Sequence, residues 1–305
     1  MAKGWDWRWP LYAVLGAGAG LALHHARRRQ ALRHGPLPVL QSLRWPVNGR
    51  HMHARVATGA ARAPALPVVM LHGLGVSGAY FTPAARALAA QFDVYVPDLP
   101  GHGLSDTPER QPDVPGLAQA LIDWMDCAGI AHACVVAHSM GCQVAVEAAL
   151  RHPGRIGPLV LIAPVTDPAA RGPWRQVGRL AMGSIFERPS LVPLVLKDYL
   201  RMGHRIVPEF QSMLAYPIEA KLPEVAAPVM LIRGERDAIA PQSWLDQAAR
   251  LLGAAPPVVI PRWGHAVHHG GASEVTEAIR SFIGGQACCT PGSPPPSLPA
   301  PSPPI

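Results

Sequence analysis

The stretch Ala133-Cys134-Val135-Val136-Ala137-His138-Ser139-Met140-Gly141-Cys142 decides the fold of this 305-residue chain. Its first half is a short, apolar, β-branched run that predicts a buried strand. Residues 143–150 combine strong helix formers with an apolar face and predict a helix. Small residues between the two indicate a sharp turn, because the helix must fold back closely against the strand. Ser139 is therefore expected at the apex, where the free N–H groups and the dipole of the helix N-terminus favour a developing negative charge.

This strand–turn–helix pattern resembles the nucleophile elbow of the α/β-hydrolases. The family's commonest pattern is Gly-x-Ser-x-Gly. This chain has Ala137 at the first glycine, and Cys142 where many members have a further glycine. Both residues are small, so we expect the turn to form. The resemblance implies an α/β-hydrolase fold: a mostly parallel eight-stranded sheet with helices on both faces and a helical cap inserted over the active site.

The other members of a catalytic triad follow Ser139 in the chain order typical of this family, each directly after a predicted strand. A buried strand over residues 228–233 leads into Gly234-Glu235-Arg236-Asp237, which is similar to the family's Gly-x-x-Asp-x-x-x-Pro pattern. The resemblance assigns the acid to Asp237, with Glu235 as the alternative. A short strand over residues 257–261 leads to Gly264-His265, which implies His265 as the base. His268 and His269 lie nearby in the sequence, and only its position singles out His265.

A Gly-rich turn, His72-Gly73-Leu74-Gly75, follows the buried strand predicted over residues 66–71. In the family, the residue after the His-Gly pair and the residue after the nucleophile donate their N–H groups to the oxyanion. The resemblance assigns this role to Leu74 and Met140, and an ordinary Gly-rich turn is the alternative interpretation. The run from Asp98 to Ser105, Asp-Leu-Pro-Gly-His-Gly-Leu-Ser, also resembles a loop found throughout the family, where its role is mostly structural.

These parts predict a serine hydrolase of the esterase or lipase-like kind. It would cleave a carboxylic ester of an apolar acyl or alcohol group through an acyl-enzyme. The apolar segment at residues 166–223 favours a greasy substrate pocket. Thioesterase or C–C bond hydrolase activity on the same triad is an alternative. A catalytically silent, membrane-tethered binding protein is another. No cofactor or metal is expected, and none of the five cysteines has metal-ligand spacing with histidines.

The net charge of +7 belongs to the N-terminus. Of the 27 Lys and Arg residues, eight lie within residues 1–50 against a single acidic residue, which leaves 19 basic and 19 acidic residues beyond. The rest of the chain therefore carries no basic footprint for nucleic acid, and we expect no nucleic-acid partner.

Residues 9–25 predict membrane association. The uncharged run over residues 9–23 has Trp5 and Trp7 before it and arginines 27–29 after it, which suits the two interfaces of a bilayer. Fifteen helical residues cover only about 22 Å of the ~30 Å hydrocarbon core, so the flanks or a thinner bilayer must supply the difference. The heavier basic flank is C-terminal, which predicts a catalytic domain on the cytoplasmic side. Export through a signal peptide, or a helix packed on a protein surface, is the alternative.

The expected organisation has five segments. They are an N-terminal apolar helix with a basic flank (1–35), the first part of the hydrolase core (36–165), the helical cap (166–223), the second part of the core (224–283) and a Pro-rich disordered tail (284–305). An Asn48-Gly49 turn predicts a hairpin of residues 43–47 with residues 50–56, one face of it wet. Ser273 is the expected N-cap of a closing helix over residues 274–283. No sequence pattern indicates an oligomeric state.

Overall fold

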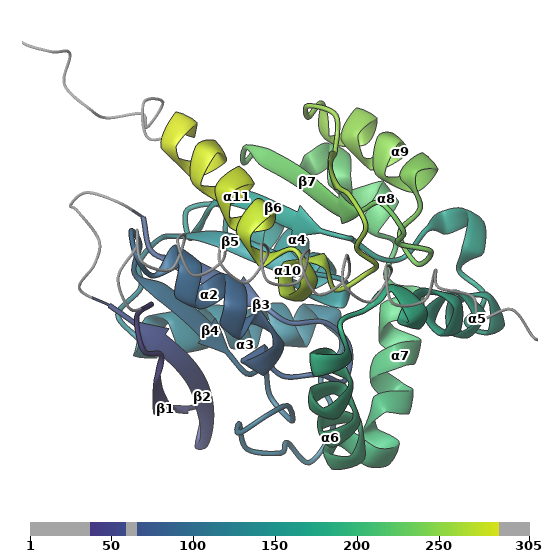
Figure 1. Ribbon diagram of the computed structural model, residues 1–305. Coiled ribbons are helices and arrows are strands. Elements are labelled where there is room, and N and C mark those ends of the chain that lie inside the picture. Colours follow the sequence, from purple (N-terminus) through teal and green to yellow (C-terminus); the bar gives the residue numbers. More distant parts are fainter. Residues whose placement is uncertain (1–36, 59–65, 287–305) are drawn as a thin grey trace, which may run out of the picture. The chain divides into compact units, whose positions relative to one another are not determined.

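The structure, a computed structural model, describes residues 37–58 and 66–286 (Figure 1). The membrane helix expected at residues 9–25 and the tail beyond residue 286 lie outside these ranges. Within the described ranges, no helix combines the length and the hydrophobicity that crossing a membrane requires.

Eight strands form one sheet in the order β1-β2-β4-β3-β5-β6-β7-β8. The strands are β1 (Gln41–Val47), β2 (Arg50–Ala57), β3 (Val68–Leu71), β4 (Val94–Pro97), β5 (Ala133–His138), β6 (Ile156–Ile162), β7 (Val229–Gly234) and β8 (Val258–Ile260). β2 pairs antiparallel with β1 and with β4, and the remaining neighbours pair in parallel. The sheet is eight-stranded and mostly parallel, so the predicted fold class is confirmed.

The hairpin of β1 and β2 closes through the expected turn, in which Asn48 and Gly49 have φ angles of 49° and 76°. These left-handed values are the ones that Asn and Gly adopt most readily, and they match the twist of a two-residue hairpin. The prediction of one wet face is wrong for His53 of β2, which is 1% exposed. The buried carboxylate of Asp98, directly after β4, holds this histidine against the sheet.

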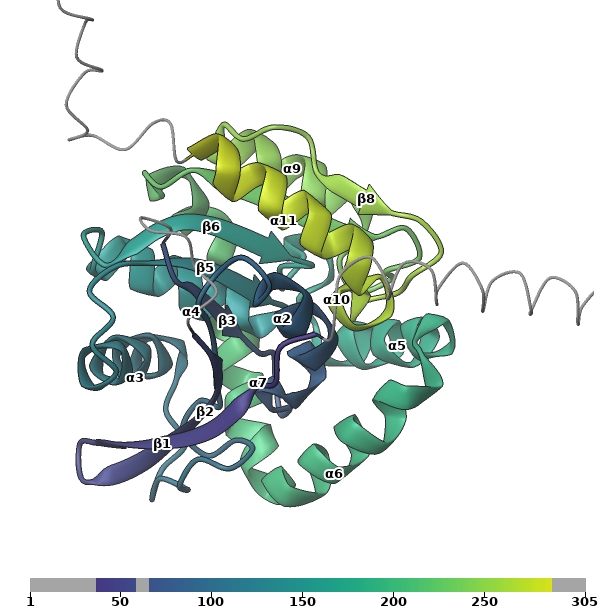
Figure 2. The same ribbon diagram turned by 60° about the vertical axis from the view of Figure 1, so that its left-hand side comes forward.

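Every residue of β3, β5 and β6 is buried, as expected for parallel strands covered on both faces. The helices flanking the strands are α2 (Thr82–Leu88), α3 (Val114–Cys127), α4 (Met140–Arg151), α9 (Gln242–Leu252), α10 (Val267–Gly270) and α11 (Ala272–Gln286). α2 packs against α11, and α3 packs against α4 (Figure 2). These two layers enclose the apolar core.

A long helical segment joins β6 to β7. Its α-helices are α5 (Pro173–Gly183), α6 (Val192–Met202), α7 (Ile206–Ala215) and α8 (Ile218–Lys221), with short 3₁₀ turns between them. α5, α6 and α7 lie together at one side of the sheet (Figures 1 and 2). This segment occupies the place in the chain where the cap is expected, and we call it the inserted helices.

The C-terminal end of the fold differs from the prediction in three details. α11 begins at Ala272, so Ser273 lies inside the helix, and its hydroxyl donates to Glu274 instead of capping. The same helix runs through Gly284 and Gly285 to residue 286. Buried Val275, Ile279 and Ile283 anchor α11 in the core, and this packing outweighs the low helix propensity of glycine. α10, a single turn before α11, has no counterpart in the prediction.

Candidate active site

Ser139 stands between β5 and α4 with a backbone that few non-glycine residues adopt, φ 56° and ψ −123°. This conformation pushes the side chain out of the sheet at the N-terminus of α4, as a nucleophile elbow requires. Gly141 makes the turn possible, because a Cβ there would lie 2.6 Å from the carbonyl oxygen of His72 and 2.7 Å from that of Leu71. The close contact of helix and strand thus demands a glycine at this position.

The two departures from the family's commonest pattern fit the turn. Ala137 is fully buried, and the thiol of Cys142 donates to its carbonyl oxygen at 3.3 Å and to that of Ile162 at 3.5 Å. Cys142 therefore connects the elbow to the end of β6 through weak hydrogen bonds. Burial raises the pKa of its thiol well above the ordinary value, which keeps it protonated as a donor.

The structure brings Ser139, His265 and Asp237 together, although they lie far apart in the sequence. The Oγ of Ser139 is 3.0 Å from Nε2 of His265, and Nδ1 of the same ring is 2.9 Å from Oδ2 of Asp237. A carboxylate only accepts hydrogen bonds, so Nδ1 carries the proton and Nε2 is left to accept from the serine hydroxyl. This arrangement can take a proton from Ser139 as it attacks a carbonyl.

The carboxylate of Asp237 is held from both sides. Its Oδ1 accepts from the N–H groups of Ile239 at 2.8 Å and Ala240 at 3.0 Å, which leaves Oδ2 for His265. Burial disfavours the charged form of His265, but the charge and hydrogen bond of Asp237, with the charge of Glu187, outweigh burial and raise the pKa of this histidine. The alternative acid, Glu235, instead accepts from the N–H of Arg262 at 2.8 Å.

The two residues predicted to donate to the oxyanion are Met140, which directly follows Ser139, and Leu74. Met140 opens α4, and the first N–H groups of a helix have no acceptor within it. Leu74 lines the same cavity as Ser139, and its N–H has no acceptor among the residues that the structure describes. Of the two residues, Leu74 lines the cavity, whereas Met140 is fully buried and is not part of the lining.

A cavity of about 390 Å³ opens at Ser139 and His265. Its walls are mostly aliphatic and aromatic side chains, many of them from α5, α6 and α7, among them Leu180, Val195 and Phe210. Glu187, in the loop between α5 and α6, brings the carboxylate that faces His265. Across the described ranges, no group of three or more His, Cys, Asp or Glu side chains is arranged to hold a metal ion.

Comparison with known proteins identifies the family. The family described as "Alpha/beta hydrolase family" matches residues 68–278, which is more than half of the chain. The chain belongs to the alpha/beta hydrolase family.

Relatives of this hydrolase have varied descriptions. It is 28% identical to the magnesium-chelatase 30 kDa subunit of Rhodobacter capsulatus, over 79% of the chain and 97% of that protein. It is 30% identical to a pimeloyl-[acyl-carrier protein] methyl ester esterase of Stenotrophomonas maltophilia, over 71% of the chain and 92% of the relative.

Solved structures similar to this hydrolase include a membrane phospholipase A described as a bacterial virulence factor, with a TM-score of 0.70, 21% identity, and coverage of 90% of this chain and 97% of that one. A thermophilic esterase from Thermogutta terrifontis has a TM-score of 0.64 and 23% identity, covering 80% of this chain and 98% of its own. Both likenesses show the fold.

A hydrogen-bonded chain behind the triad of this hydrolase has no counterpart in the sequence analysis. Nε2–H of His138 donates to the carbonyl oxygen of His265 at 3.0 Å, so Nδ1 of His138 accepts from the hydroxyl of Tyr80 at 2.7 Å. That hydroxyl in turn accepts from the N–H of Gly73 at 2.8 Å. Burial, reinforced by nearby His268 and His265, lowers the pKa of His138, which keeps its ring neutral for this arrangement. These hydrogen bonds connect the loop at Gly73, the end of β5 at His138 and the backbone of His265.

The histidines next to His265 in the sequence take other roles. His268 is fully buried against Tyr80, Phe81 and His138, with ring centroids 4.2–4.4 Å apart. His269 bonds the carbonyl oxygen of Tyr80 at 2.9 Å. Of the three histidines, His265 is the one hydrogen bonded to Ser139 in the described part of the chain.

The inserted helices hold the oxyanion loop by two carboxylates. Asp198 of α6 accepts from the N–H of Ser77 at 2.8 Å and from its hydroxyl at 2.6 Å. Glu209 of α7 accepts from the N–H of Gly75 at 3.2 Å and lies 3.0 Å from Nε2 of His102. Burial opposes the charged form of His102, yet Glu209 outweighs it and raises the pKa of this histidine. We call these contacts the loop clasp.

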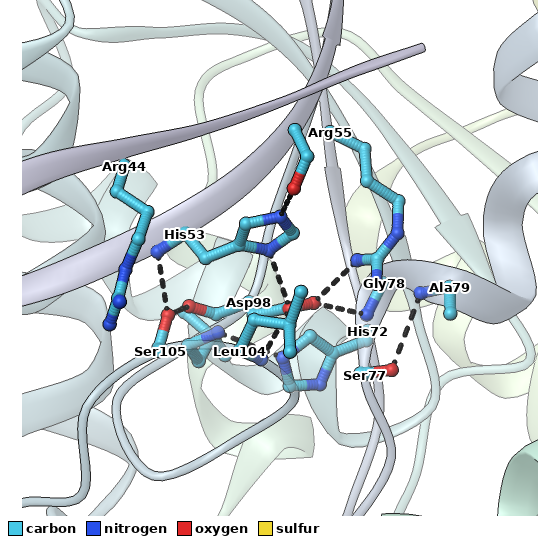
Figure 3. Close-up of polar contacts among 12 residues, drawn as sticks. Arg44, His53, Arg55, His72, Ser77, Gly78, Ala79, Asp98, Leu104 and Ser105 are labelled. Atoms are coloured by element: carbon cyan, nitrogen blue, oxygen red, sulfur yellow. Dashed lines mark hydrogen bonds and ion pairs between the residues drawn. The ribbon is translucent and has the colours of Figure 1, made fainter.

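The loop from Asp98 to Ser105 is organised around the Asp98 carboxylate, which is fully buried (Figure 3). Oδ1 accepts from Arg55 at 3.0 Å and from the N–H of Gly78 at 2.8 Å, and Oδ2 accepts from the N–H of Leu104 at 2.9 Å. Burial would raise the pKa of Asp98, but its hydrogen bond with His53 and the charge of Arg55 hold that pKa below its usual range. These contacts agree with the structural role that the family resemblance implies for this loop.

Asp98 is also part of a second Ser–His–Asp trio. Nδ1 of His53 is 2.8 Å from Oδ2 of Asp98, and Nε2 of the same ring is 2.6 Å from Oγ of Ser42 on β1 (Figure 3 shows the His53–Asp98 contact). Ser42 and His53 lie on β1 and β2, at one edge of the sheet, and Asp98 follows β4. None of the three lines the cavity at Ser139.

Proposed function

We propose that this chain is a serine hydrolase that cleaves a carboxylic ester of an apolar acyl or alcohol group. The observation that carries the proposal is the continuous hydrogen-bonded line from Ser139 through His265 to Asp237, with distances of 3.0 and 2.9 Å, at the foot of an apolar cavity. The esterase described above, to which the chain is 30% identical, supports the same class of reaction.

In this mechanism, Nε2 of His265 takes the hydroxyl proton while the Oγ of Ser139 attacks the ester carbonyl. Asp237 holds the imidazole in the required tautomer and stabilises the imidazolium. The oxyanion accepts from the N–H groups of Leu74 and Met140, each worth about 3–4 kcal/mol in the transition state. His265 then protonates the departing alcohol. Water activated by the same ring hydrolyses the acyl-enzyme and regenerates the Ser139 hydroxyl.

The cavity supports an apolar substrate of moderate size. Its volume of about 390 Å³ falls at the lower end of the range for small-molecule pockets. Its walls are apolar away from the triad, so a saturated acyl chain or a small hydrophobic alcohol would gain most from burial there. We propose that the inserted helices act as the cap, because α5, α6 and α7 all contribute to these walls.

Labelling with a fluorophosphonate probe tests the proposal. We expect the wild-type chain to be labelled and Ser139→Ala to be unlabelled. Ser42→Ala is the matched control: it removes the other serine that is hydrogen bonded to a His–Asp pair, and it should label like wild type. If the wild-type chain stays unlabelled while a known serine hydrolase reacts, the protein is a binding protein instead.

A substrate panel sharpens the assignment. Esters and thioesters of rising chain length, together with a ring-cleavage product that reports C–C bond hydrolysis, would be compared with Ser139→Ala as the blank. Turnover that rises with chain length and is highest for oxygen esters supports the proposal. Faster turnover of thioesters or of the C–C substrate would reassign the reaction while leaving the triad in place.

We further propose that residues 9–25 associate the protein with a membrane, with the catalytic domain on the cytoplasmic side. The support is the uncharged run with tryptophans before it and arginines after it. Retention of the full chain on membranes after an alkaline carbonate wash, and release of a chain lacking residues 1–30, is the expected result. Equal release of both would overturn this assignment.

A further inference from the structure

The outer surface of the inserted helices carries an unusual concentration of apolar side chains. Nine of the fourteen exposed large hydrophobic residues in the described ranges lie between residues 174 and 207. Six of them form what we call the apolar rim: Trp174, Val177 and Leu180 of α5, with Val192, Leu196 and Leu200 of α6. Trp174 is 86% exposed and Leu200 is 75% exposed. Large exposed apolar groups gathered in this way mark a surface that meets a partner or a membrane.

Half of the apolar rim borders the active-site cavity. Leu180 of α5 and Val192 and Leu196 of α6 line the cavity, and each is about half exposed. The exposed apolar residues of both helices therefore reach the cavity. On α6 the exposed apolar residues of the rim recur every four positions along one side, while Tyr199 and Met202 point inward. A helix that only covers a soluble core has one apolar face, whereas α6 has a second one turned outward.

Basic residues outnumber acidic ones in the segment that carries the apolar rim. Residues 171–205 contain seven Lys and Arg residues and two acidic ones. The two acids point inward, Glu187 to the cavity and Asp198 to Ser77. Lys197 and Arg201 lie on exposed positions of α6 beside Leu196 and Leu200, and neither has a carboxylate partner within the described residues.

We propose that the apolar rim docks on an anionic lipid surface, with Trp174 and Leu200 in the interface and the cavity mouth facing the bilayer. An outward apolar stripe flanked by cations is the pattern of a helix that lies in a membrane interface, and each Lys or Arg near anionic headgroups strengthens the attachment. A second copy of the chain fits less well, since a symmetric contact would set these cations against one another. The apolar rim is built from residues other than 9–25, and its docking is independent of hydrolysis.

A fluorescent reporter on the apolar rim tests the proposal in the full chain. The variant Leu200→Cys would be made with Cys127, Cys288, Cys289 and Ser139 replaced, then labelled with an environment-sensitive nitrobenzoxadiazole dye. The remaining thiols are buried, and burial raises the pKa of Cys134 to about 12, so they resist labelling. Val259→Cys on β8, at a 40% exposed position, carries the dye in the matched control.

With vesicles of phosphatidylglycerol and phosphatidylcholine, the dye at position 200 should brighten and be quenched by doxyl-labelled lipids, and the dye at position 259 should not. Lys197→Glu with Arg201→Glu should weaken the lipid-dependent brightening and quenching of the dye at position 200, a readout that attachment through residues 9–25 does not supply. A dye at position 200 that remains in water on vesicle-bound protein would overturn the proposal. So would brightening without vesicles that grows with protein concentration, which would identify a second copy as the occupant. Equal brightening at position 200 with pure phosphatidylcholine vesicles, unaffected by the charge reversals, would overturn the anionic preference.

Discussion

Two Ser–His–Asp trios in this chain share one hydrogen-bond pattern and differ in their surroundings. In both, the Asp faces Nδ1 of the histidine and the serine faces Nε2. Ser139 sits on a strained turn at a helix N-terminus, beside free N–H groups and an apolar cavity. Ser42 sits on the regular, exposed edge strand β1.

The two carboxylates differ as much as the two serines. Asp98 shares its charge with Arg55 and two backbone N–H groups besides His53, so it holds two strands and a loop together. Asp237 faces one histidine and two adjacent N–H groups, and no arginine of the described ranges contacts its carboxylate. A hydrogen-bonded trio therefore does not make a nucleophile. The strained turn at a helix N-terminus and the apolar cavity distinguish the candidate active site from the second trio.

The sharpest way to break this comparison is to neutralise Asp237. In Asp237→Asn, the amide would donate to Nδ1 of His265 and force the proton onto Nε2, where it blocks acceptance from Ser139. We expect kcat to fall by about 10⁴-fold with the fold retained. Ester hydrolysis and the thermal unfolding midpoint, measured on the same preparation, check this. A variant that keeps a tenth of the activity would show that the trio at Ser139 is not the catalytic one.

The same substitution at Asp98 should act on stability. Asp98→Asn leaves Arg55 facing an uncharged partner in a largely buried site, and we expect the free energy of unfolding to fall by about 3 kcal/mol. Urea unfolding measures it. Because the folded-state pKa of Asp98 is lowered, the difference from wild type is complete at neutral pH and shrinks as the pH falls below about 4, where the unfolded carboxyl is protonated. An unchanged urea midpoint at pH 7 would refute the structural role.

Tyr80→Phe tests the support behind the Ser139 trio. Losing the hydroxyl leaves the N–H of Gly73 and Nδ1 of His138 buried without partners, which should cost about 2 kcal/mol in unfolding free energy. Tyr95→Phe is the control, since that hydroxyl has no hydrogen-bond partner within the described residues and should be removed at little cost. Equal effects of the two variants in urea unfolding would count against the hydrogen-bonded chain.

The smallest effect concerns the pH profile. His265 must be neutral to act as a base, so kcat/KM falls as the pH drops through its raised pKa. Glu187→Gln removes a negative charge that contributes to this rise, and the acid limb should move to lower pH. Glu235→Gln, whose carboxylate faces Arg262 instead, should leave the limb in place. A shift in the opposite direction for Glu187→Gln would show that its charge does not act on the base.

The parts that were predictable from sequence carry local signals. Ser139, Asp237 and His265 each follow a strand, and the Asn48-Gly49 turn closes the hairpin. Short patterns therefore marked these residues, and the structure brings the first three together, while their catalytic roles stay a prediction. Tyr80, His138 and the loop clasp join residues 58 to 134 positions apart, and no short pattern records such pairs. The exposure predicted for His53 is wrong for the same reason. The alternating pattern of β2 indicates a solvent-exposed face, but the carboxylate of Asp98, 45 residues away, holds His53 in the interior.

The loop clasp has a consequence for redesign. Asp198 and Glu209 belong to the inserted helices, but they accept hydrogen bonds from the backbone N–H groups of Ser77 and Gly75, in the loop that contains Leu74. Replacing α5 to α7 with those of another family member, in order to change which substrates fit the cavity, would therefore also replace the hydrogen bonds that hold this loop. A chimera needs both acidic side chains carried across, or the new helices would alter the rate together with the choice of substrate.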